Sequence, residues 1–189
     1  MVERIAPPPT ETQAPAMVTF QEFLKLFEGQ YAEWLMGKVE VYVSNNYNHN
    51  DILSFFDTVL RLFLGITKLG KLGLAGFPMY LGDDHPSRQP DLMIILTDHL
   101  DRLTPNYLNG PADICVEIVS PESAERDYGA KFVEYEAAGV REYWLIDPQR
   151  QRAEFHHLTA DGVYHRLPLD GMGRLVSNLL PGFVLDPAI

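Results

Sequence analysis

Cysteine is almost absent from this sequence of 189 residues, and Cys115 is its one example, so no disulfide can form within the chain. Proteins without disulfides are typical of reducing compartments, and we therefore expect a cytoplasmic protein. Cys115 stands inside an apolar run, which favours a buried structural thiol over a reactive nucleophile.

Long apolar runs are also missing. No stretch approaches the roughly 20 apolar residues that a membrane-spanning helix needs, so we expect no contact with a membrane. Residues 1–16 contain four prolines and no apolar segment of the kind found in signal peptides. We predict a flexible N-terminal tail over residues 1–16 and a single domain over residues 17–189.

Basic residues are scarce. The 15 lysines and arginines are outnumbered by 26 acidic residues, which gives a net charge of −11. Binding to nucleic acid normally depends on Lys and Arg contacts to phosphates, so this charge argues against a nuclease. A cluster of carboxylates that binds a divalent metal, or a basic patch formed only in an oligomer, would reconcile the charge with such a function.

Three segments have the apolar periodicity of helices. The first covers residues 20–29 and begins with a capping box, Thr19 with Glu22. The second covers residues 49–65 after Asn48 as N-cap, and the third covers residues 122–138 and ends at Gly139.

Short apolar runs predict strands. A hairpin is expected over residues 31–43 with a type II′ turn at Gly37-Lys38. Further strands are expected over residues 71–81, 91–96, 114–119, 142–146, 152–158 and 163–167, and residues 179–189 are expected to pack on the sheet. Strands that alternate with helices in this way predict an α/β fold, a mixed β-sheet flanked by helices.

Three charged residues stand where charge is costly. Asp91 opens one apolar strand and Glu117 lies in the middle of another, so each needs a partner or a metal. On a helical wheel Lys131 falls in the middle of the apolar side, whereas Arg126 falls on the solvent side and Asp127 at the edge. An inward lysine requires an inward anion, for which Glu117 is the nearest candidate.

Two inward carboxylates with one inward lysine are typical of sites that cleave phosphodiesters. Asp91 and Glu117 would bind Mg²⁺, or Mn²⁺, through oxygen ligands, and Lys131 would position water or stabilise developing charge. The alternative from these residues alone is a buried Glu–Lys ion pair that only helps to specify the core.

The motifs around these residues resemble a known family. Pro90-Asp91, Glu117-Ile118-Val119-Ser120-Pro121, Asp127 with Lys131, and Tyr143-Trp144 with Asp147-Pro148 are similar to the Uma-two family of the PD-(D/E)XK nuclease superfamily. The resemblance implies a restriction-endonuclease-like fold and an endonuclease that acts on DNA. It departs from the superfamily pattern at Val119, where a lysine is usual, and implies that Lys131 on the helix takes that place.

The resemblance also adds weaker candidates. Glu33 resembles a carboxylate that completes the metal shell, with an exposed hairpin residue as the alternative. His49 resembles the family's histidine and could contact substrate or be a half-buried core residue. Asp127 could orient Lys131, and the loop residue Arg88 could touch phosphate, although such arginines are usually solvated. The late histidines are expected at the surface: His156, His157 and His165.

Two hypotheses of different classes follow. The first is a Mg²⁺-dependent DNA endonuclease that uses Asp91, Glu117 and Lys131, with Glu33 and His49 in auxiliary roles. The second, favoured by the net charge of −11, is a nuclease fold kept as a binding or regulatory module without catalysis. By analogy with nucleases of this fold, a homodimer is also expected.

Overall fold

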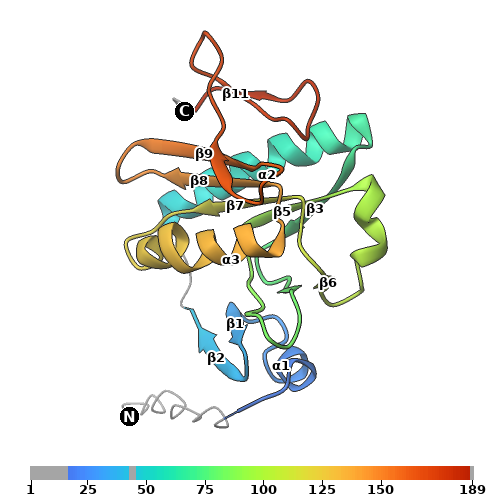
Figure 1. Cartoon of the computed structure of the whole chain (residues 1–189). Helices are drawn as coiled ribbons and strands as arrows, with labels where there is room; N and C mark the ends of the chain where they lie inside the picture. Colours follow the sequence, from blue (N-terminus) through green and yellow to red (C-terminus); the bar gives the residue numbers. More distant parts are fainter. Residues whose placement is uncertain (1–16, 43–45, 188–189) are drawn as a thin grey trace, which may run out of the picture.

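A six-stranded mixed sheet forms the centre of the molecule in the computed structural model, which describes residues 17–42 and 46–187 (Figure 1). The predicted tail at residues 1–16 lies outside the described residues. In spatial order the strands are β10 (Tyr164–Arg166), β9 (Arg152–Leu158), β8 (Glu142–Asp147), β7 (Ile114–Ile118), β5 (Leu92–Leu96) and β3 (Gly70–Leu74). Only β7 and β8 run parallel within this sheet, and the remaining neighbours are antiparallel. The prediction of a mixed sheet flanked by helices is confirmed.

Helices cover both faces of the sheet (Figure 1). The long helix α2 (Tyr47–Thr67) packs on one face, together with the strand pair β11 (Leu175–Val176) and β12 (Val184–Leu185). The shorter helix α3 (Lys131–Ala138) packs on the other face. Because strand side chains alternate, Ile94 and Val116 point toward α2, whereas Met93 and Cys115 point toward α3. The buried thiol and the packing of the C-terminal segment on the sheet were both predicted.

The N-terminal segment forms a small lobe beside the main sheet. Helix α1 (Phe20–Leu26) begins with the predicted capping box and packs on a hairpin of β1 (Ala32–Leu35) and β2 (Lys38–Val41). The predicted turn was wrong by one residue. Leu35 pairs with Lys38, so the central residues are Met36 and Gly37, both at positive φ, as a type I′ turn requires.

Shorter elements complete the described chain. They are a parallel strand pair, β4 (Met79–Tyr80) with β6 (Leu108–Asn109), and the 3₁₀ helix η1 (Thr97–Arg102). No helix in the described part of the chain is long and apolar enough to span a bilayer.

The boundaries of all three predicted helices differ from the sequence-based expectation. Helix α1 ends at Leu26 and not at residue 29. Helix α2 begins two residues earlier, because Asn46 and not Asn48 is its N-cap and accepts a hydrogen bond from the amide of His49 at 3.0 Å. The third helix is not one continuous α-helix. A turn of π-helix, η2 (Arg126–Ala130), precedes α3. Such π-turns are rare and occur often at functional sites.

Candidate active site

The antiparallel pairing of β5 and β7 brings the two predicted carboxylates together. Leu92 pairs with Val116, so Asp91, just before β5, lies beside Glu117 near the end of β7. The Asp91 Oδ2 atom accepts a hydrogen bond of 2.8 Å from the amide of Ile118, the residue after Glu117. Both side chains line one cavity of about 250 Å³. The parallel crossover from β7 to β8 then places η2 and α3 over the same end of the sheet.

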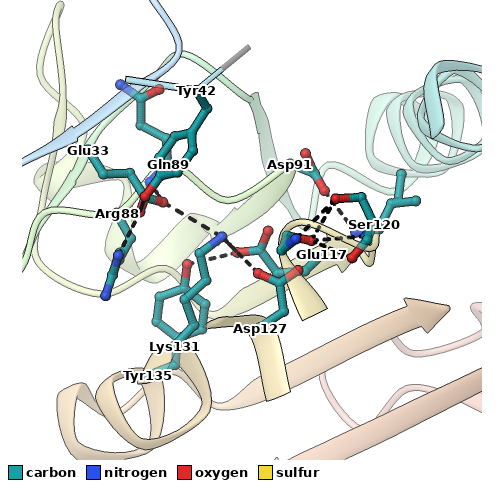
Figure 2. Close-up of polar contacts among 12 residues, drawn as sticks. Glu33, Tyr42, Arg88, Gln89, Asp91, Glu117, Ser120, Asp127, Lys131 and Tyr135 are labelled. Carbon is teal, nitrogen blue, oxygen red and sulfur yellow. Dashed lines mark hydrogen bonds and ion pairs between the residues drawn. The ribbon is translucent and has the colours of Figure 1, made fainter. Parts of the chain in front are cut away.

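Lys131 points into this cluster, as the helical wheel predicted. Its ammonium group is buried, 2.8 Å from Glu117 Oε1, 3.3 Å from Asp127 Oδ1 and 3.6 Å from Glu33 Oε1 (Figure 2). Burial alone lowers the pKa of Lys131, but the surrounding carboxylates, with Glu117 first, outweigh burial and raise it above its ordinary value. Lys131 is therefore a fixed cation in the middle of the acidic groups.

Glu117 is held by two donors on one oxygen. Lys131 and the Tyr135 hydroxyl, which donates a hydrogen bond of 2.9 Å, both contact Oε1. Complete burial raises the pKa of Glu117 to about 8, and the charges of Asp127 and Asp91 add to this rise, against the opposing effect of Lys131. In the metal-free protein at neutral pH the neutral acid of Glu117 is therefore favoured.

His49 supports Asp91 from α2. Its Nε2 atom lies 3.1 Å from Asp91 Oδ2, and its side chain is buried. The Nδ1 atom of the same ring is buried without a hydrogen-bond partner. The structure thus places His49 at the cavity and against one of the two predicted metal ligands.

Glu33 is buried and not an exposed hairpin residue. Its Oε2 atom accepts hydrogen bonds from Arg88 Nη1 at 2.6 Å and from the Tyr42 hydroxyl at 3.1 Å. Burial raises the pKa of Glu33, but the positive charges of Lys131 and Arg88 prevail and hold it below the ordinary value. Glu33 lines the cavity as an ionised group on the far side of Lys131 from Asp91 (Figure 2).

Arg88 corrects one expectation. It is buried, not solvated, and its guanidinium donates hydrogen bonds to Glu134 at 2.7 and 2.8 Å as well as to Glu33. The partners stand 55 and 46 residues away in the sequence, which local patterns do not reveal. Arg88 therefore braces Glu33 and is not free to bind phosphate.

The π-turn accounts for two further differences. Asp127 was expected at the edge of the helix but is 1% exposed, and Arg126 was expected on the solvent side but lines the cavity. A π-turn has more residues per turn than an α-helix, so a wheel of 100° per residue misplaces side chains that precede it. Of the three late histidines predicted at the surface, His165 is exposed, whereas His156 and His157 are half-buried. His156 packs against Phe132 and Glu154.

Four buried polar atoms have no hydrogen-bond partner among the described residues, and every one belongs to a residue that lines this cavity: His49 Nδ1, Gln89 Oε1, Arg126 Nε and Asp127 Oδ1. The last of these is in an ion pair with Lys131, so three are without any polar partner there. Unsatisfied buried groups are costly, so their concentration here indicates a place that is completed by a ligand, an ion or water.

The donor set suits a hard divalent cation that retains most of its water. Within the described residues no group of three Asp, Glu, His or Cys side chains is arranged to hold a metal ion on its own. Mg²⁺ usually binds proteins through one or two carboxylates, with water and substrate phosphates as its other ligands. Asp91 and Glu117, which both line the cavity, fit that requirement.

Comparison with solved structures supports the fold. The crystal structure of "a putative nuclease belonging to DUF820" from Anabaena variabilis ATCC 29413 is similar, with a TM-score of 0.70 and 21% sequence identity over 90% of this chain and 95% of that one. No curated protein matches the sequence.

The sequence itself matches a family model over most of its length. The match covers residues 20–188, which include both strands and the helix of the cavity. The chain therefore belongs to the Uma2 family, which is described as "Putative restriction endonuclease".

Proposed function

We propose that the protein is a Mg²⁺-dependent endonuclease that hydrolyses phosphodiester bonds of DNA. The observation that most supports this proposal is the position of Asp91, Glu117 and Lys131 at one cavity, together with the unsatisfied polar atoms around it. The family match supports the same class of reaction.

Asp91 and Glu117 would hold the metal, which supplies a Lewis acid and lowers the pKa of a bound water when present. The Ile118 amide and His49 orient Asp91. Lys131, held by Glu117 and Asp127, offers a fixed ammonium group that can position the attacking water or stabilise charge on the phosphate. Glu33 has an auxiliary role, since it anchors Lys131 from the opposite side.

Cleavage of plasmid and oligonucleotide DNA in Mg²⁺ tests the proposal. A metal ligand contributes several kcal/mol to transition-state stabilisation, so Asp91→Ala should reduce cleavage by roughly 100-fold or more. Asp98→Asn is the matched control, because Asp98 is exposed in η1, beyond the opposite end of β5. If Asp91→Ala cleaves DNA as fast as the wild-type protein, the proposal is wrong.

A binding or regulatory module without catalysis remains the second candidate. The net charge of −11 and the lack of a three-ligand metal group among the described residues favour it. It predicts that the pure protein cleaves no DNA or RNA in Mg²⁺ or Mn²⁺, and that no metal binds at accessible concentrations.

The endonuclease proposal also includes a cytoplasmic location and a homodimer. Sedimentation analysis would test whether the protein forms a homodimer.

A further inference from the structure

Arg126 is a second cation at the cavity, close enough to Glu33 for its charge to help lower the pKa of that carboxyl. It is half-buried, lines the cavity, and forms no ion pair with any described residue. Its Nε atom is buried and donates no hydrogen bond in the described structure. Buried polar groups normally have a hydrogen-bond partner, so this unpaired donor at the cavity suits an anion that enters it.

The other cation of the cavity is already engaged. Lys131 lies within 3.6 Å of oxygens from Glu117, Asp127 and Glu33, which hold its ammonium group in place. Among the described lining residues, Arg126 is therefore the cation that can bind a phosphate without breaking an ion pair to a carboxylate. A phosphate that enters the cavity needs an available cation, because most of the charged side chains that line the cavity are acidic.

Tyr42 fixes the direction of this guanidinium. The Arg126 Cζ atom lies 4.2 Å from the centre of the Tyr42 ring, an arrangement that stacks the planar guanidinium on the aromatic face. The Tyr42 hydroxyl lies 2.7 Å from Glu40 and 3.1 Å from Glu33, which anchors the ring to the N-terminal hairpin (Figure 2). Stacking uses the face of the guanidinium and leaves the edge, where its N–H donors lie, available for an anion.

We infer that Arg126, stacked on Tyr42, binds a backbone phosphate of the nucleic acid next to the one that is cleaved. This inference rests on the proposed function. It assigns Arg126 to substrate positioning, and it explains how so acidic a protein can hold a polyanion at one defined place. Arginine suits this role because its planar donors match the geometry of phosphate oxygens.

Binding can be measured without cleavage by fluorescence anisotropy. The probe is a fluorescein-labelled DNA duplex of 20 base pairs, about two helical turns, with Ca²⁺ in place of Mg²⁺ and gels to show that the DNA stays intact. Titrations of the full chain from 50 to 200 mM NaCl give both the affinity and its salt dependence. One lost phosphate contact should weaken binding of Arg126→Gln about tenfold and reduce the slope of log K against log salt by about 1.

Matched variants separate positioning from a structural effect. Arg166 also has no ion pair in the described structure but is exposed on β10, so Arg166→Gln should leave the affinity and the salt slope unchanged. Tyr42→Leu removes the aromatic ring that Arg126 contacts and should weaken binding. Thermal melting of each variant shows whether the fold is retained.

The outcomes are distinguishable. If the wild-type protein binds and cleaves DNA, and Arg126→Gln binds with the same affinity and salt slope, the inference fails and the proposed function stands. If Arg126→Gln lowers only the melting temperature, Arg126 is structural and the inference fails in the same way. If the wild-type protein neither binds nor cleaves DNA, the proposed function fails and the inference with it.

Discussion

Glu117 joins the chemistry of the cavity to the stability of the protein. It is buried, next to Asp91 and Asp127, and Lys131 and the Tyr135 hydroxyl offset the cost of its negative charge. A divalent cation beside it would favour the ionised form, so metal and proton compete for this carboxylate. In the absence of metal, the folded protein is expected to keep the proton.

The pH dependence of stability follows from this. The pKa of Glu117 is about 8 in the folded protein against an ordinary value of 4.5, so the folded state binds more protons between these values. The contribution of Glu117 protonation to the unfolding free energy is full below about pH 4.5 and is lost as pH rises through about 8. Without metal, the unfolding free energy of the wild-type protein should fall relative to Glu117→Gln between pH 5 and 9, by at most about 1.4 kcal/mol per pH unit. Urea unfolding at several pH values measures this, and a constant difference between the two proteins would contradict it.

Lys131 offers a second test at the scale of single residues. Lys131→Met leaves Glu33 and Asp127 buried as anions without their shared cation. Removal of one partner from a buried ion pair typically costs about 3–5 kcal/mol, so urea unfolding at pH 7 should show a loss of this order. Lys25→Met in α1 is the exposed control and should change stability little. A loss of under about 1 kcal/mol for Lys131→Met would mean that the cluster does not depend on this cation.

At the scale of elements, the π-turn η2 determines which side chains face the cavity. Asp127 and Lys131, four residues apart, form an ion pair of 3.3 Å at the end of this turn, a spacing that neighbours on a helix share. Arg126, the first residue of the turn, lines the same cavity.

The sequence was informative where a pattern is local. The apolar runs around Asp91 and Glu117 predicted buried strands, and the wheel predicted that Lys131 faces inward, because these signals depend on the alternation and periodicity of nearby residues. The π-turn has no local signature, so the burial of Asp127 and the place of Arg126 at the cavity were not predicted. The pairing of Asp127 with Lys131 was predicted, because it depends only on their spacing of four residues. The partners of Arg88 lie too far along the chain for any periodic pattern to identify them.

At the scale of the whole molecule, the charge of −11 repels a polyanion, so the proposed association with DNA should depend on divalent cations. The cavity adds its own carboxylates to this unfavourable field. We therefore expect DNA binding to be at least about tenfold weaker in EDTA than in Ca²⁺ at the same ionic strength. Anisotropy titrations under the two conditions check this, and equal affinity would show that the metal has no part in recruitment of the substrate.

The central claim is that Asp91 and Glu117 together bind a divalent metal ion. Calorimetric titration of Mg²⁺ and Mn²⁺ into the wild-type protein, Asp91→Asn, Glu117→Gln and the control Asp98→Asn tests it most directly. We predict heat of binding for the wild-type protein and the control, and its loss in the two cavity variants while both remain folded. Binding that persists in Asp91→Asn and Glu117→Gln, or its absence from the wild-type protein, would contradict the account.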